Sequence, residues 1–294
     1  MKKRVVDVCK AIVSSMLIAS IATGFISCAE NADTSETESV ETEVSTTTTV
    51  VEEISSVPEY SVLNSSDAYN VVSAHASDFG LSIENYPQNI IDGFVYFPDA
   101  YNFVLEFPLN SNGDDEAYEY PDISGEISKV KVPQLYQWDT RWAYRAYCGQ
   151  PFGFNGSGPT CVSIAAIYLT GNTDLTPAWI MDYTINNSYC DNSTGTYRTL
   201  ITSGAAGLGI DVVQITIDED RVKRNLDVGN LIVCSMGEGV FSNPYESEHY
   251  IIITGYKDET FYIIDPASKT RTEQEWTWTG LAMSMNIPWV YRIM

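Results

Sequence analysis

The strongest constraint on the fold is a segment that is apolar nearly all round, Cys161–Leu169. It follows a Gly-rich turn, 153–160, in which Pro159 falls at a helix start, where its missing N–H costs nothing. A helix without a polar face must be buried. Gly171 is suited to end this helix. The pattern therefore predicts a buried central helix.

Two further helices and several strands are predicted after it. One helix is expected at Thr176–Asn186 and another between Asp218 and Gly229, with Asp218 as its cap. Short apolar runs, punctuated by Gly and Pro as in antiparallel sheets, predict strands at Ile210–Ile217, Leu231–Met236, Tyr250–Thr254, Phe261–Ile264 and Trp289–Ile293. Helices followed by strands indicate an α+β domain.

Charge is distributed unevenly along the chain, which has 294 residues and a net charge of −23. Between Cys28 and Glu126 there are 21 acidic residues and no Lys or Arg, whereas 127–294 contains 17 acidic and 12 basic residues. Nucleic acid is excluded as a partner, since binding to phosphate requires a basic surface.

The amino terminus has the pattern of a secretory signal, predicted at 1–27. A basic Met1–Lys10 precedes Ala11–Ile26, an apolar run of 16 residues that is too short for a typical membrane span. The run ends in Phe-Ile-Ser-Cys, which resembles the lipobox of bacterial lipoproteins, with Cys28 as the lipidated residue. This resemblance implies a lipid-anchored protein on the extracellular face of the bacterial cytoplasmic membrane. The alternative is a secreted protein in which Cys28 is incidental.

Two acidic segments separate this signal from the domain that carries the chemistry. Residues 28–60 are rich in Ser, Thr and Glu and predict a disordered, extended stalk, because they cannot bury enough apolar surface to fold. Residues 61–126 contain aromatic clusters and predict a lead-in segment that packs against the main domain. His75 in this segment is expected to be structural or exposed.

The domain at 127–294 contains a series of short motifs in order. They are Val132-Pro133, Gln137–Trp142, Gly156-Ser157-Gly158-Pro159-Thr160, Met236–Gly239, His249–Ile252, Gly255-Tyr256, Asp265-Pro266 and Trp276–Trp278. Together they resemble the stand-alone relatives of the bacteriocin-processing cysteine peptidases, peptidase family C-39. The resemblance implies a papain-like cysteine peptidase fold, with a central helix packed on an antiparallel sheet.

The same resemblance assigns four site residues. Family members place a Cys thiol at the start of the central helix, where the helix dipole and an imidazole lower its pKa. That position is Ser157 in this chain, and the imidazole is His249. Asp265 corresponds to the residue that fixes the imidazole tautomer, and Gln137 to the oxyanion donor.

Ser157 departs from the family pattern, and the sequence leaves open how the replacement of Cys by Ser affects catalysis. A hydroxyl does not ionise as a thiol does, so His249 would have to act as a true general base. One interpretation is a catalytically impaired or inactive protein that binds peptides in the inherited cleft. The alternative is an active peptidase or amide hydrolase that uses Ser157, His249 and Asp265, and a third is an engineered or miscopied Cys-to-Ser change. Ser157 could also simply be a helix N-cap.

The remaining chemistry-bearing residues predict no cofactor and no metal. Cys161 lies one turn after Ser157 and is expected to be a buried structural thiol. With Cys148, Cys190 and Cys234 it could form one or two disulfides, with three possible full pairings. The expected partner is a peptide or protein, cell-wall peptide included. Asp218-Glu219-Asp220 is interpreted as a solvated helix cap rather than a calcium loop.

Overall fold

The computed structural model describes residues 62–111 and 118–294. The predicted signal, Cys28 and the predicted stalk lie outside the described residues. Among the described residues, no helix has both the length and the apolar character required to cross a membrane.

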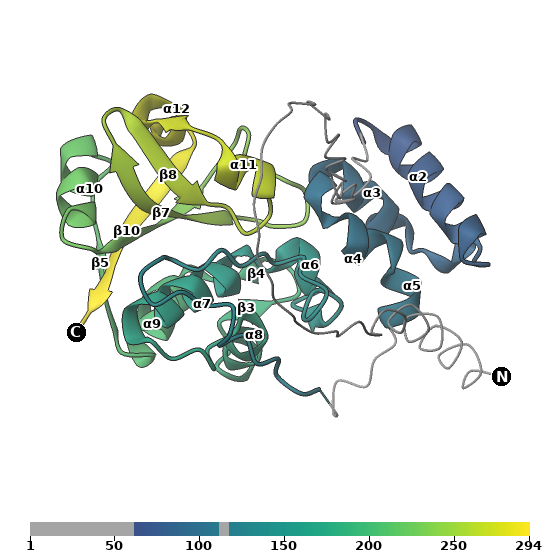
Figure 1. The fold of residues 1–294 in the computed structure, drawn as a ribbon, viewed down its shortest axis with the longest axis horizontal. Coiled ribbons are helices and arrows are strands. Elements are labelled where there is room, and N and C mark those ends of the chain that lie inside the picture. The colour runs from purple at the N-terminus through teal and green to yellow at the C-terminus, as the bar shows by residue number, and fades with distance from the viewer. Residues whose placement is uncertain (1–61, 112–117) are drawn as a thin grey trace, which may run out of the picture. The chain divides into compact units, whose positions relative to one another are not determined.

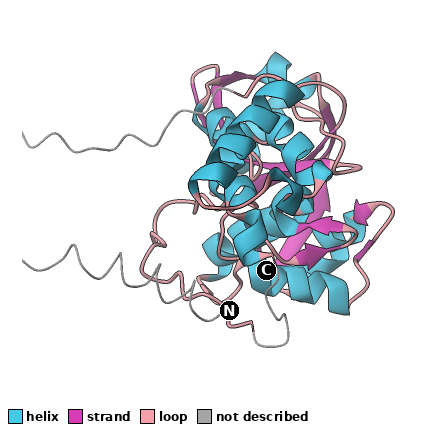
Figure 2. Ribbon diagram, turned by 90° about the vertical axis from the view of Figure 1, so that its right-hand side faces the viewer, coloured by secondary structure: helices cyan, strands magenta, loops and turns pink. Residues whose placement is uncertain are grey.

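A six-stranded antiparallel sheet forms the carboxy-terminal part, in the order β5-β10-β6-β7-β8-β9 (Figure 1). The strands are β5 (Ile210–Gln214), β6 (Leu231–Met236), β7 (His249–Lys257), β8 (Thr260–Ile264), β9 (Trp276–Thr277) and β10 (Met285–Ile293). All five predicted strands are present, β6 with the predicted ends and the others with ends no more than four residues from those expected. The chain is thus an α+β protein with an antiparallel sheet, as predicted (Figure 2).

Both faces of this sheet are covered, which explains why β6 is buried along its whole length. Side chains alternate between the two faces of a strand. Leu231 and Val233 pack into a core with α7 (Ser157–Thr170), whereas Ile232 and Cys234 pack into a second core that includes Val222 of α10 (Glu219–Leu226). A strand buried on both faces contains consecutive apolar residues.

The predicted helices also form where the local signals place them. α7 is buried over most of its length and ends at Gly171, whose φ of 73° requires the left-handed conformation that glycine adopts readily. α8 (Pro177–Asn186) is capped by the Thr176 side chain, which accepts from Trp179 N. In α10, the Asp218 side chain accepts from Arg221 N, in agreement with the predicted cap.

Residues 62–111, which we call the cap, form a helical unit with its own aromatic core. Its α-helices are α2 (Ser65–Asp78), α3 (Gln88–Tyr96), α4 (Tyr101–Leu105) and α5 (Phe107–Asn110). Their buried residues form a cluster with only three buried residues from outside the cap, Ala143, Phe154 and Ala267. His75 stacks on Phe79 with ring centroids 4.4 Å apart, and burial lowers its pKa.

The four cysteines of the domain form one disulfide. Cys148 and Cys190 are bonded and connect two short hairpins, β1–β2 (Ala146–Tyr147 and Gln150–Pro151) and β3–β4 (Cys190–Asp191 and Gly195–Thr196). Cys161 and Cys234 are free and buried. This selects one pair from the possibilities that the sequence left open.

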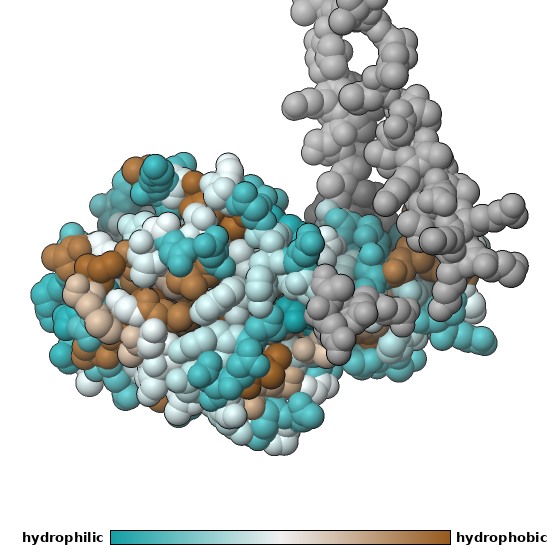
Figure 3. Space-filling model, turned by 90° about the horizontal axis from the view of Figure 1, so that it is seen from below, coloured by the Kyte–Doolittle hydropathy of each residue, from teal (hydrophilic) through white to brown (hydrophobic). Residues whose placement is uncertain are grey.

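Exposed apolar side chains are dispersed over the surface. Figure 3 shows several separate hydrophobic patches on one face, with hydrophilic residues between them. The most exposed large apolar residues, Val130, Met283 and Leu63, lie in different parts of the chain. Scattered apolar residues of this kind are normal on a protein surface.

The disulfide should contribute substantially to stability, because it closes a loop with a sequence separation of 42. Replacing both Cys148 and Cys190 by Ala should lower the free energy of unfolding by about 2–4 kcal/mol, measured by urea denaturation. Reduction of the wild-type protein should produce a similar loss. An unchanged denaturation midpoint in both experiments would contradict this prediction.

Candidate functional site

Ser157 is the first residue of α7 and is almost completely buried, with 1 % of its surface exposed. The N-cap of the helix is Gly156, which makes no side-chain cap hydrogen bond. The Ser157 hydroxyl is turned toward strand β7, where its Oγ accepts a hydrogen bond of 3.2 Å from Tyr250 N. The interpretation of Ser157 as an N-cap is therefore wrong, because it lies one position inside the helix and its oxygen serves the neighbouring strand.

His249 begins β7 and is held by Asp265, which directly follows β8. The distance from His249 Nε2 to Asp265 Oδ1 is 2.9 Å. Asp265 is itself fully buried and accepts from Arg271 Nε at 2.6 Å and from Ala267 N at 2.8 Å. Antiparallel pairing of β7 with β8 brings these two residues together across the sheet, although 16 positions separate them in the chain.

Glu246 occupies the space between the helix start and the imidazole. Its Oε1 accepts from Ser157 N at 2.9 Å, and its Oε2 lies 2.7 Å from His249 Nδ1. Asn243 Nδ2 donates to the same Oε2 at 3.1 Å. The Glu246 side chain is only 2 % exposed. A buried carboxylate thus connects the two residues that a peptidase would need to bring into direct contact.

Gln137 lies at the site but its amide is engaged elsewhere. Its Nε2 donates to Gly153 O at 3.1 Å, and its backbone N donates to Pro266 O at 2.9 Å. The side chain is fully buried, and its Oε1 has no hydrogen-bond partner among the described residues. Gln137 therefore connects α6 (Phe152–Asn155), the short helix before α7, to the segment after β8.

The four residues assigned by the resemblance are thus only partly assembled. Asp265 and His249 are in direct contact. Within the described part of the chain, no hydrogen bond connects Ser157 Oγ to either nitrogen of His249. Glu246 was not predicted to contribute, because it and Glu248 both precede His249 in a polar loop and the sequence does not show which of them turns inward.

The two carboxylates make His249 a cation over a wide pH range. Burial lowers the pKa of His249, but Asp265 and Glu246 raise it by more, to about 9. Conversely, burial would raise the pKa of Asp265, but His249 and Arg271 hold it well below its usual range. The imidazole is therefore protonated at neutral pH, and neither ring nitrogen carries a free lone pair.

The two free thiols do not substitute for a nucleophile at position 157. Cys161 and Cys234 have no exposed surface. Burial raises the pKa of both thiols well above the usual range. A thiol reacts as its thiolate, so both side chains are unreactive at neutral pH.

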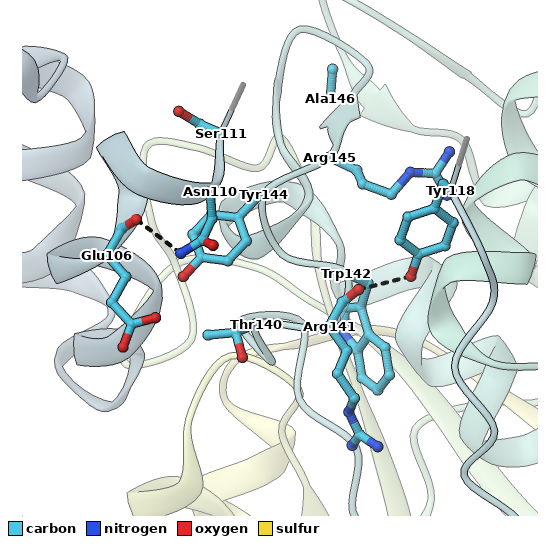
Figure 4. Close-up of a pocket in the computed structure, with 10 residues that line it drawn as sticks. All are labelled: Glu106, Asn110, Ser111, Tyr118, Thr140, Arg141, Trp142, Tyr144, Arg145 and Ala146. Atoms are coloured by element: carbon cyan, nitrogen blue, oxygen red, sulfur yellow. Dashed lines mark hydrogen bonds between the residues drawn. The ribbon is translucent and has the colours of Figure 1, made fainter. Parts of the chain in front are cut away.

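One pocket lies away from these residues. It has a volume of about 410 Å³ and is bounded by Glu106, Asn110 and Ser111 of the cap, by Tyr118 and by the segment 140–146 (Figure 4). Tyr118 Oη donates to Arg141 O at 2.8 Å on one side, and Asn110 Nδ2 donates to Glu106 O at 3.1 Å on the other (Figure 4). None of the assigned site residues lines it. Among the described residues, no group of three or more His, Cys, Asp or Glu side chains is placed to hold a metal ion.

The raised pKa of His249 predicts how stability depends on pH. Its pKa is about 9 in the folded protein against 6.5 ordinarily, so its stabilising contribution is complete below about pH 6.5 and is lost as the pH rises through 9. Since one pKa unit corresponds to about 1.4 kcal/mol, the loss should be of the order of 3 kcal/mol. Asp265 acts in the opposite direction, because its pKa is depressed in the folded protein. The stability that Asp265 contributes is lost as the pH falls below the ordinary pKa of an Asp side chain.

Glu246→Gln should reduce this alkaline loss, because it removes one of the two carboxylates that hold the proton on His249. Urea denaturation at a series of pH values measures the effect. Glu238→Gln is the matched control, since Glu238 is exposed. Equal alkaline slopes in the wild type and Glu246→Gln would contradict the assignment of the proton to this network.

Comparison with known proteins supplies the family. No curated protein matches the chain. A crystal structure from Bacillus anthracis, provisionally identified as a C39-like peptidase, is similar over 55% of this chain and 95% of its own, with 14% identity and a TM-score of 0.40. The family model described as "Peptidase_C39 like family" matches residues 129–293, more than half of the chain. The chain therefore belongs to the Peptidase_C39-like family.

Proposed function

We propose that this protein is a non-catalytic member of the C39-like family, with a papain-like fold, that holds a polypeptide against the face of the inherited site. The observation that carries this proposal is the position of Glu246 between Ser157 N and His249 Nδ1. Glu246 interferes with two requirements of acyl transfer, a free general base and free oxyanion donors, and burial of the site residues prevents a third, access of the substrate.

The first requirement is a base that can accept the proton of the nucleophile. A serine hydroxyl needs a hydrogen-bonded general base. The Ser157 Oγ instead accepts from Tyr250 N, and His249 Nδ1 faces Glu246. A protonated His249, with a pKa of about 9, cannot take up another proton at neutral pH.

The second requirement is a set of free donors for the oxyanion. In this family the backbone N–H at the helix start and the Gln side chain would stabilise the developing negative charge. Here Ser157 N already donates to Glu246 Oε1, and Gln137 Nε2 donates to Gly153 O. A second negative charge at the same position would be repelled by the Glu246 carboxylate.

The third requirement is access. Ser157, His249, Asp265 and Gln137 are each at most 2 % exposed. A polypeptide substrate cannot reach the Ser157 hydroxyl in this state. The cap contacts residues that neighbour these four in the chain, which supports a polypeptide-binding role for this part of the domain.

One observation favours the alternative of an active hydrolase. The His249–Asp265 pair is intact, with Asp265 further oriented by Arg271 and Ala267 N. Catalysis through Ser157 would require Glu246 to leave, so that His249 loses a proton and contacts the hydroxyl. Replacement of Glu246 is therefore the change that distinguishes the two functions.

We also propose that the protein is lipid-anchored at Cys28 on the outer face of the bacterial cytoplasmic membrane. The basic and apolar pattern at 1–27 and the lipobox-like sequence support this location. The uniformly acidic 28–60 segment would then separate the domain from the membrane.

Labelling with a small peptide-like acyl probe tests the absence of catalysis. Wild type and Ser157→Ala should be labelled equally slowly, because the Ser157 hydroxyl has no available base. Labelling of the wild type that disappears in Ser157→Ala would overturn the proposed function and establish the active hydrolase.

A thiol at position 157 tests whether Glu246 is the obstacle. Ser157→Cys combined with Glu246→Ala should be labelled about 100-fold faster than Ser157→Cys combined with Glu238→Ala, since only the first pair lets the thiol meet the imidazole. Glu238 is exposed, so its replacement controls for the loss of one carboxylate. Equal rates for the two double variants would show that Glu246 does not block the site.

A further inference from the structure

The cap contacts three segments that carry site residues. Tyr245, next to Glu246, donates from Oη to Asn89 O of the cap at 2.7 Å. Asp99 of the cap accepts from Ser268 Oγ at 2.9 Å, three residues after Asp265. Phe154, three residues before Ser157, packs between cap side chains. The cap therefore packs against residues that flank the site, and we call this surface, which includes Phe154, Tyr245 and Ser268, the site face.

Aromatic rings form the centre of this contact. Phe154 stacks on Phe97 with centroids 4.8 Å apart and meets Phe103 edge-on at 5.1 Å. Tyr245 contacts Phe97 at 5.8 Å and Phe154 at 4.8 Å. Rings at these separations contribute beyond their buried area. At Gly93 of α3 the approach is so close that a Cβ atom would lie 2.3 Å from the Phe154 ring.

The domain below the cap has cores of its own. Neither of the two clusters that cover the faces of the sheet contains a residue of 62–111. The family model begins at residue 129, and all six strands of the sheet lie within 210–293. The cap is therefore an addition to a family domain whose sheet is complete without it.

We propose that the cap is an exchangeable occupant of the site face, and that the partner of this face is a helical polypeptide segment that presents closely spaced aromatic rings. The inference rests on the proposed function, and names the class of polypeptide bound. A partner segment would replace the rings of Phe97 and Phe103 against Phe154 and Tyr245. Because the cap is attached to the domain, its effective concentration is of the order of millimolar, and a separate segment binds only when the cap loosens.

A reporter thiol next to the cap contact makes release measurable in the full-length protein. Ser157→Cys places a thiol at a position that is 1 % exposed and lies three residues after Phe154. Mass spectrometry after maleimide treatment gives the labelling rate of the peptide that contains this thiol. Adding Gly93→Ala should accelerate labelling about tenfold or more, because the new methyl group collides with the Phe154 ring. Gly125→Ala is the matched control, since a Cβ there has no atom within 4 Å.

A second pair of variants tests cap release without adding volume. Tyr245→Phe removes the hydrogen bond between domain and cap, whereas Tyr86→Phe removes one of the same length within the cap, from Tyr86 Oη to Leu105 O. In the Ser157→Cys background, Tyr245→Phe should accelerate labelling more than Tyr86→Phe. If the Gly93→Ala protein does not fold, this comparison decides whether the cap is released from the domain.

The class of partner is tested by adding a segment in trans. A synthetic peptide of residues 86–111 should slow the labelling of the Ser157→Cys, Gly93→Ala protein again, and the same peptide with Phe97→Ala and Phe103→Ala should not. No protection by the first peptide, or equal protection by both, would overturn the assignment of an aromatic helical partner.

Two results would overturn the exchangeable cap itself. One is a labelling rate at position 157 that neither Gly93→Ala nor Tyr245→Phe changes. The other is labelling of Cys161 and Cys234 in step with position 157, since those thiols are in the domain cores and become exposed only if the whole domain unfolds. The experiment measures alkylation of the thiol and not hydrolysis. Discovery of hydrolytic activity in the wild type would therefore contradict the proposed function but would not affect the evidence for release of the cap.

Discussion

A buried chain of charges organises the centre of the molecule. It runs from Arg271 through Asp265, His249 and Glu246 to the N–H of Ser157. Each of its members comes from a different segment, so the chain connects α11 (Lys269–Glu273), the ends of strands β8 and β7, the loop before β7, and the start of α7. Buried charges are tolerated only when each is paired, and removal of one partner typically costs about 3–5 kcal/mol. The same arrangement that makes this network stable also keeps the imidazole protonated and separates it from Ser157.

Much of the fold could be predicted from local patterns. The buried helix after the Gly-rich turn, its end at Gly171 and the Asp218 cap depend on residues a few positions apart, and all are present. The strands were predicted from short apolar runs punctuated by Gly and Pro, which are typical of antiparallel sheets. The helices of the cap were not predicted individually, because their aromatic residues pack on each other and on Phe154 of the domain rather than along one regular face.

Only those site residues that belong to the family motifs could be predicted from the sequence. The contact between His249 and Asp265 follows from the pairing of adjacent strands. Glu246 could not be identified, since its role depends on how the loop after Asn243 turns, and the Asn243 side chain accepts from Tyr245 N and Glu246 N within that turn. Likewise, a serine at a helix start suggests an N-cap, but the Ser157 hydroxyl pairs with the backbone of a strand that is distant in sequence.

The central claim is that Glu246 and Asp265 hold His249 as an imidazolium ion, and NMR titration of that ring tests it most directly. The chain has only two histidines, so His75→Gln leaves His249 as the sole imidazole signal. We expect both ring nitrogens to be protonated at neutral pH, with deprotonation near pH 9. A neutral ring at pH 7, with a midpoint at or below the ordinary value of about 6.5, would contradict this account and restore His249 as a possible general base.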